Sequence, residues 1–172
     1  MTALSPNQVL ITNGGDQCVE EYNLDTGEMS PFTAACDGAA RSSQTGHRIN
    51  DVSMDDPIGV FYDGGQKVNI SLYYARVVLS IDTTTDQSSV LLTTSSPPRH
   101  LGYGLNSDII HITLKNGFGA IKDRSVEYIT GTDGQSLGKT MGDITTTLMD
   151  RPLGFVEVEN GTWTVADRSN DR

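Results

Sequence analysis

The sequence predicts an all-β fold, mainly an antiparallel β-sandwich or jelly-roll-like domain, with at most one short helix near residues 140–150. Eighteen glycines and abundant Thr, Ser, Asn and Asp indicate many turns and β-branched strands. Strong helix formers do not cluster over any long window. Short segments of alternating apolar and polar residues follow one another with turn residues between them, which is typical of sandwiches and barrels.

The first predicted element is a hairpin. Val9–Ile11 begins a strand, Asn13–Asp16 turns it, and Gln17–Leu24 is its partner, because Asn-Gly between apolar runs favours a tight turn. This pair is similar to one hairpin of a β-propeller blade. It does not recur at a fixed period, however, and a propeller needs several blades, so we expect no propeller.

The next stretch, residues 33–57, is small and polar and shows little periodicity. A connection of this length without structure of its own is uncommon inside a compact domain. We therefore predict one β domain over residues 1–172 that carries a long irregular loop or arm at about 33–57. The polar tail, 167–172, is expected to fray.

The central segment, Lys67–Ile81, has the clearest period-two alternation and predicts a strand with one buried and one wetter face. Val77–Leu79 interrupts the alternation, which indicates either burial on both faces or a bulge. Thr83–Asp86 turns into a strand at Ser89–Thr94, and Pro97 follows it, since proline cannot donate to a ladder.

The second half of the chain continues the pattern of short strands. Further strands are expected at Asp108–Lys115, Ala120–Thr130, Leu153–Val158 and Thr162–Ala166. The last two flank Asn160-Gly161 and predict a hairpin. Thr140–Asp150 has near-helical spacing of its apolar residues and is the expected helix, which Pro152 would stop.

Charge and cysteine content limit the partners and the compartment. The formal charge is −10, with 22 acidic and 12 basic residues and no basic stripe, so we expect no nucleic acid and no anionic membrane as partner. The start of the chain lacks a signal-peptide pattern, and no apolar run spans a bilayer. This predicts folding in the cytoplasm, where Cys18 and Cys36 are expected to be buried thiols rather than a disulfide.

The motifs that could carry chemistry are incomplete. The glycine-rich stretch at 134–140 resembles a phosphate-binding loop, but Asp133 stands where its first glycine is needed. None of His47, His100 and His111 has a second ligand at metal-binding spacing, and His111 is expected on a solvent face. Glu157 and Glu159 share one face of a strand, which is expected to be solvated. We therefore predict no catalytic residues, no cofactor site and no metal site.

One loop has the composition of a binding loop. Pro97 gives residues 97–104 a rigid start, and the loop then places Arg99, His100 and Tyr103 among glycines. The three side chains are tentative ligand contacts. An equally good interpretation is a connection in which Tyr103 covers the edge of the core.

Three functions fit these features. The first is a structural, self-assembling and non-enzymatic protein, most plausibly a virion component such as a capsid, cement or tail subunit. It would bind other copies of itself or neighbouring particle subunits through the arm at 33–57. The second is a ligand-binding β-sandwich of carbohydrate-binding or lectin type that uses Tyr103 and Trp163. The third is a hydrolase on a β scaffold, for which the sequence offers no nucleophile–base pair.

Overall fold

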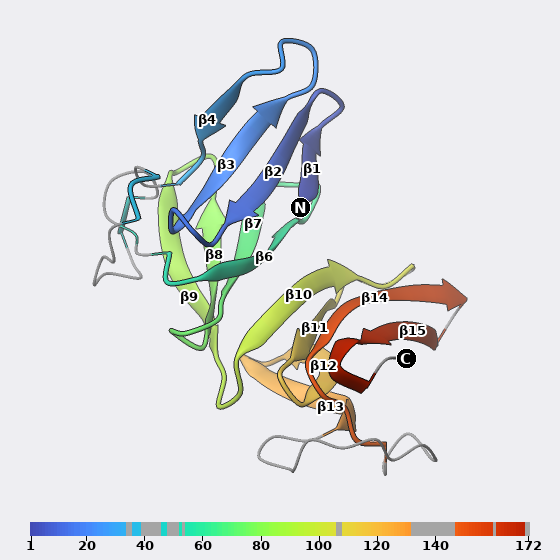
Figure 1. Cartoon of the computed structure of the whole chain (residues 1–172). Coiled ribbons are helices and arrows are strands. Elements are labelled where there is room, and N and C mark those ends of the chain that lie inside the picture. The colour runs from blue at the N-terminus through green and yellow to red at the C-terminus, as the bar shows by residue number, and fades with distance from the viewer. Residues whose placement is uncertain are drawn as a thin grey trace.

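The computed structural model describes residues 1–33, 36–38, 46–47, 52, 54–105, 108–131, 147–159 and 161–170. These residues form strands almost throughout (Figure 1), with one short 3-10 helix, η1, at Arg168–Asn170. No helix among them is long and apolar enough to cross a membrane. The strands in chain order are β1 Thr2–Ser5, β2 Gln8–Asn13, β3 Cys18–Asn23, β4 Met29–Pro31, β5 Gly46–His47, β6 Pro57–Tyr62, β7 Lys67–Leu72, β8 Val77–Asp82, β9 Gln87–Thr93, β10 Pro98–Tyr103, β11 Ile110–Leu114, β12 Gly117–Lys122, β13 Ser125–Gly131, β14 Pro152–Glu159 and β15 Thr162–Asp167.

The strands form four antiparallel sheets, so the all-β prediction is confirmed. The first sheet has the order β1-β2-β3-β4, the second β5-β9-β8-β7-β6, the third β10-β11-β12-β13 and the fourth β14-β15. Apart from β5, each strand pairs with its neighbours in the sequence. These up-and-down connections differ from the Greek-key connections of a jelly roll.

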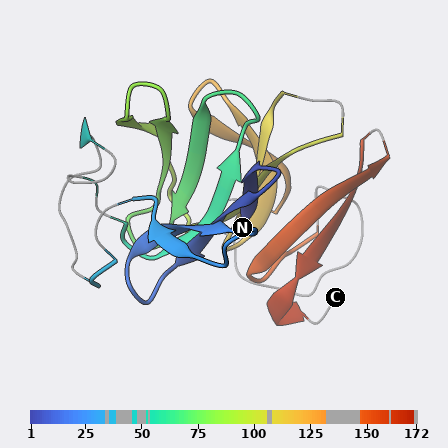
Figure 2. The same cartoon turned by 90° about the horizontal axis from the view of Figure 1, so that it is seen from above.

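Neighbouring sheets pack face to face, and the inner edge strands β1, β6, β10 and β14 lie nearest the centre. β6 contacts both β2 and β10, and β10 contacts β14. The sheets fan outward from these inner strands (Figures 1 and 2). Successive up-and-down sheets in a radial arrangement are the architecture of β-propeller blades. The fold is therefore propeller-like, and the rejection of a propeller on sequence grounds was wrong.

The first two sheets repeat the positions of their strands and turns, although the residues at these positions differ. β7 and β8 begin 59 residues after β2 and β3, as the pairs Gln8–Lys67 and Cys18–Val77 show. Positive φ recurs at the same interval: Gln17 and Arg76 have φ of 57° and 56°. The third sheet instead uses a two-residue turn between β12 and β13, so the 59-residue spacing does not continue and no period stands out in the sequence.

The core lies between the sheets in two clusters. The first joins sheets one and two, and the second joins sheets two and three, so the second sheet is covered on both faces. Val77 and Leu79 point into the first cluster and Val78 into the second. Burial on both faces thus explains the lost alternation in β8, where a register shift also lies between Val78 and Leu79.

The predicted irregular segments are described only in part. The stretch 140–146 of the expected helix and the glycine-rich loop 134–140 lie outside the described residues, and 147–150 is not helical. In the segment 33–57, the described Val52 and Met54 are buried in the first core cluster. At the tail, η1 follows β15, and the buried Asn170 side chain donates to Asp167 at 2.6 Å.

Candidate functional site

A pocket of about 310 Å³ lies where the inner edge strands of the four sheets, β1, β6, β10 and β14, meet. Its position is set by the fold, because every sheet contributes its inner strand. The lining residues are Met1 and Thr2 from the first sheet, Val60 and Phe61 from the second, 100–105 from β10 and the residues that follow it, and 155–157 from β14. Ligand pockets in proteins occupy roughly 300–1,000 Å³, so this one suits a small ligand.

The strand β10 separates two aromatic contacts. Its alternation turns Tyr103 toward β6, where the ring meets Phe61 edge-on at 4.7 Å between centroids. His100 points to the other side and meets Phe155 of β14 at 5.0 Å. Glycine at 104 makes room for Glu157 and Trp163, since a Cβ there would meet the Glu157 carboxylate and lie 3.1 Å from the Trp163 ring. Aromatic side chains from three sheets therefore surround the pocket.

Glu157 fixes the rim of the pocket. The residue is only 8% exposed. The backbone N–H of Leu105 donates to one carboxylate oxygen at 2.6 Å, and the N–H of Gly161 donates to the other at 2.6 Å. The carboxylate thus joins the segment after β10 to the turn of the last hairpin. The predicted solvated position is wrong for Glu157, which is buried, and right for Glu159, which is exposed; Val156 and Val158 are exposed as well.

An aromatic cluster supports the β14–β15 hairpin from inside. His111 lies 4.2 Å from Trp163 and 5.9 Å from Phe118, measured between ring centroids. The prediction of a solvent-facing His111 was wrong, since only 7% of the residue is exposed. Burial lowers the pKa of His111, against the opposing effects of the Ile109 carbonyl and the Glu157 carboxylate. The neutral imidazole therefore belongs to the packed interior.

Two titratable side chains of the pocket, His100 and Tyr103, are shifted toward their neutral forms. Burial, together with the nearby amino group of Met1, lowers the pKa of His100. Burial, and then the carboxylates of Asp63 and Asp108, raises the pKa of Tyr103. A neutral imidazole and a neutral phenol act as hydrogen-bonding groups beside acidic neighbours.

The structure separates the three predicted contact residues. His100 and Tyr103 line the pocket. Arg99 does not line it; its guanidinium lies 5.0 Å from the ring centre of Tyr73, between the second and third sheets. The backbone of His47 pairs with Gln87 at the far edge of the second sheet. The binding roles of Arg99, His100 and Tyr103 stay predictions.

The sequence analysis did not place Phe61, Phe155 or Glu157 at a ligand site, although all three line the pocket. Phe155 and Glu157 alternate on one face of β14, and this alternation was the available signal. The two valines on the opposite face conceal it, because valine is the more usual buried residue.

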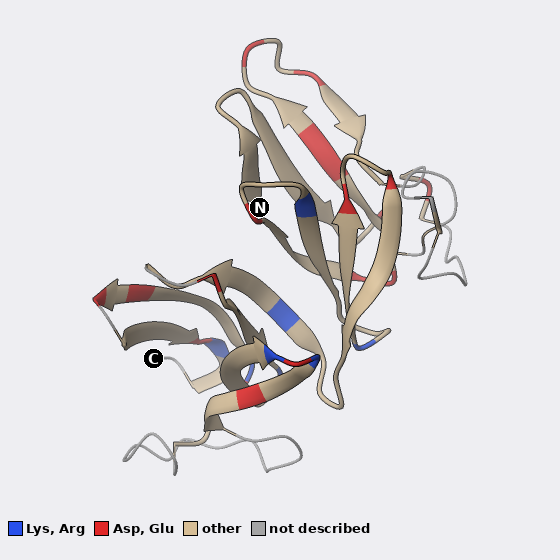
Figure 3. Cartoon of the chain, turned by 180° about the vertical axis from the view of Figure 1, so that it is seen from behind, with Lys and Arg blue, Asp and Glu red and all other residues tan. Residues whose placement is uncertain are grey.

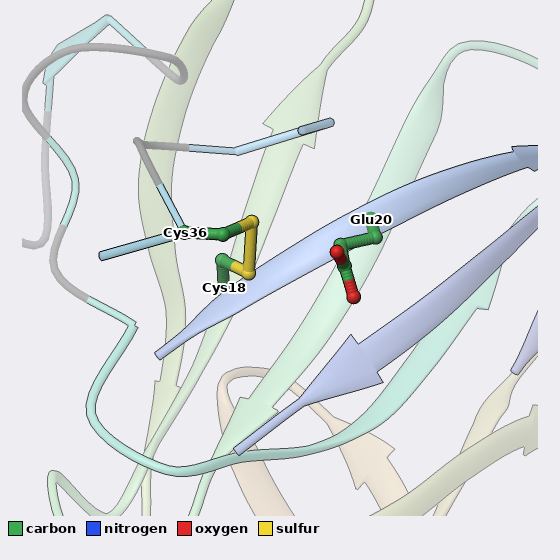
Figure 4. Close-up of side chains that lie close together, drawn as sticks. All are labelled: Cys18, Glu20 and Cys36. Atoms are coloured by element: carbon green, nitrogen blue, oxygen red, sulfur yellow. A yellow bond between two sulfur atoms is a disulfide. The ribbon is translucent and has the colours of Figure 1, made fainter. Parts of the chain in front are cut away.

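The two cysteines form a disulfide, which corrects the prediction of free thiols. Cys18 and Cys36 have a Cα–Cα distance of 5.2 Å, within the usual range for a disulfide. Glu20 lies nearby on β3 (Figure 4), and its carboxylate is close enough to both sulfurs to suggest a metal site. Bonded sulfurs offer no thiolate, however, so this cluster lacks the ligands of a zinc site.

The comparisons with known proteins concern the fold. No protein-family model matches the chain. No curated protein matches it in sequence. Among solved structures, the fold is similar to an auxiliary nutrient binding protein from Bacteroides thetaiotaomicron, with a TM-score of 0.58 and 11% identity over 96% of this chain and 51% of that one. It is also similar to virginiamycin B lyase from Staphylococcus aureus, with a TM-score of 0.55 and 15% identity over 96% of this chain and 61% of that one. The chain thus spans between half and two thirds of the length of two proteins whose fold it shares.

Proposed function

We propose that this chain is a ligand-binding domain whose pocket takes a small polar ligand with one flat apolar face, such as a sugar ring. The observation that carries the proposal is the convergence of four inner strands on one pocket with aromatic walls. Aromatic rings offer a large apolar contact, and a few placed polar groups give orientation. This is the carbohydrate-binding alternative of the sequence analysis, placed on a propeller-like scaffold.

The polar groups near the pocket suit hydroxyl groups. Asp63 and Asp108 lie near enough to Tyr103 to raise its pKa, and carboxylates accept hydrogen bonds from hydroxyls. Acidic and basic residues are interspersed along the described ribbon, with no continuous basic stripe (Figure 3). The likeness to a nutrient binding protein supports a binding role as well.

The disulfide supports action outside the reducing cytoplasm, because disulfides persist mainly in oxidising compartments. This differs from the cytoplasmic folding expected from the sequence. The virion role has no support from the two comparison proteins, which are a nutrient binding protein and a lyase. The absence of enzymatic activity stays a prediction.

A glycan array followed by calorimetry tests the proposal. Tyr103→Leu removes one aromatic wall and should weaken binding at least tenfold, because an aromatic hot-spot contact contributes about 2 kcal/mol or more. Tyr74→Leu is the matched control: Tyr74 is 69% exposed on the turn between β7 and β8 and does not line the pocket. Absence of any glycan hit, or equal loss in both variants, would contradict the proposed function.

A further inference from the structure

The outward face of the last sheet carries exposed valines. Phe155 and Trp163 point inward to the aromatic cluster, so the alternate residues of β14 and β15 point away from it. Val158 on this outward face is 56% exposed. The outward residues are Gly154, Val156, Val158, Thr162, Thr164 and Ala166. We call them the trailing face.

The outward face of the first sheet carries an apolar row across all four strands. Leu10 and Val19 belong to the opposite face and are buried in the core. Met29 in the row is 53% exposed. The row runs through consecutive cross-strand partners, which are Ala3, Val9, Tyr22 and Met29. We call this row the leading face.

Face-to-face packing of neighbouring sheets is the rule inside this chain. The first sheet packs on the second, the second on the third, and the third on the fourth through β10 and β11. Among the described residues, the leading and trailing faces are the two sheet faces that continue this stacking and have no sheet against them.

The net charge of the chain bears on what these two faces can bind. A chain of formal charge −10 repels its own copies, and exposed apolar side chains gathered on a sheet face mark interaction sites. The trailing face has one carboxylate beside it, because Glu159 pairs with Thr162 beyond the register shift that follows Glu157. The two similar folds also extend well beyond the length that this chain covers.

We propose that the trailing face of one copy packs against the leading face of a second copy. The two faces differ, so the contact is heterologous, and it occurs twice if the pair closes as a ring. Two copies of four sheets give a number of blades within the usual range of propellers, roughly four to eight. Both terminal sheets contribute to the pocket, so the partner would complete its wall.

Light scattering during size-exclusion chromatography tests this contact on the full chain. The wild type should have twice the 18.5 kDa mass of one chain. Val158→Lys on the trailing face and Met29→Glu on the leading face should each give a monomer. Leu24→Lys, in the turn between β3 and β4 and 54% exposed, is the control and should stay a dimer. Unchanged circular dichroism and melting would show that each variant folds.

Mixing Val158→Lys with Met29→Glu tests whether the trailing face of one copy meets the leading face of the other. One contact of the mixed pair places Val158→Lys opposite Met29→Glu, so opposite charges meet there, and the second contact is wild type on both sides. The mixed dimer should therefore form. A monomeric wild type overturns the proposal, and so does a failure of the mixture to associate. Both readouts are independent of glycan binding, so this proposal and the proposed function can fail separately.

Discussion

Asn23 and Asp82 accept the same two backbone hydrogen bonds in turns that lie 59 residues apart. Asn23 Oδ1 receives the N–H groups of Asp25 and Thr26 at 2.9 and 3.1 Å. Asp82 Oδ1 receives those of Thr84 and Thr85 at 2.9 and 3.0 Å. Each turn then places a residue with positive φ four positions on, Gly27 in the first turn and Asp86 in the second. The two sheets thus use one turn design with different residues.

Substitutions at Asn23 and Asp82 should change how steeply the stability of the fold is lost at low pH. The Thr84 hydroxyl, followed by the N–H groups of Thr85 and Thr84, lowers the pKa of Asp82 from 3.8 to about 2. A carboxylate with a lowered pKa stabilises the fold above 3.8, and this stabilisation is lost as the pH falls toward 2. Asp82→Asn should remove that loss. Asn23→Asp should add a smaller one, because the first turn has Asp25 where the second has Thr84, so the new carboxylate gains the backbone N–H groups but no hydroxyl.

Urea unfolding followed by Trp163 fluorescence, from neutral pH down to about 2, measures both variants. At neutral pH, Asp82→Asn should lower the midpoint, because the neutral amide oxygen accepts the same backbone bonds without the charge that strengthens them. A variant with an unchanged slope of stability against pH would show that Asp82 titrates normally.

Gly59→Ala should destabilise the contact between the second and third sheets. A Cβ at 59 would meet the carbonyl oxygen of Arg99 and lie 2.8 Å from Ser71 Oγ, so the strands must separate. Overpacking of this kind costs about 1–3 kcal/mol in the free energy of unfolding. Gly154→Ala is the control, since nothing lies within 4 Å of its Cβ position. Equal midpoints for both variants in urea unfolding would contradict the close approach.

The strands could be predicted from the sequence better than their assembly. Period-two alternation over Lys67–Ile81 located β7 and β8, because a buried face leaves a local pattern. It did not show the turn between them at 73–76, since Tyr73 and Tyr74 continue the apolar run. Sheet order depends on contacts between distant segments, which no local pattern records.

The loop that carries His100 and Tyr103 could be predicted from the sequence, whereas its partners from other sheets could not. The composition of residues 97–104 suggested a binding loop, and the structure brings Trp163 and Phe155 against its glycines. The partners come from strands more than 50 residues away, and their burial depends on which face of β14 meets β10. Glu157 is buried only because two backbone N–H groups satisfy its carboxylate.

Loss of the disulfide should lower the stability of the folded chain. Cys18 and Cys36 are 18 residues apart, and a loop of this size contributes about 3 kcal/mol through the unfolded state. The double variant Cys18→Ser and Cys36→Ser should unfold at lower urea, and reductant should shift the wild type in the same direction. The double variant is its own control, because reductant should not move it. Free thiols detected in the native protein would contradict the bond.

Glu157→Gln should destabilise the last hairpin and the rim of the pocket. The amide retains one oxygen acceptor, while its NH₂ group would face a backbone N–H that the carboxylate now accepts. A hydrogen bond to a charged group contributes about 1.5–3 kcal/mol. Glu159→Gln, exposed two residues away, is the matched control. Similar urea midpoints for both variants would show that Glu157 does not hold the two segments.

The buried His111 should make the fold sensitive to mild acid. Its pKa is lowered from 6.5, so below 6.5 the unfolded chain binds a proton that the folded chain does not. This contribution to stability is therefore present above 6.5 and is lost as the pH falls toward the folded pKa. His111→Phe keeps an aromatic ring against Phe118 and Trp163 and removes the titration, so stability should fall less steeply below 6.5. His100 adds a slope of the same sign, since burial lowers its pKa too. Proton NMR of the imidazole resonances measures both groups directly, and a His111 resonance that titrates at or above 6.5 would refute its burial as a neutral ring.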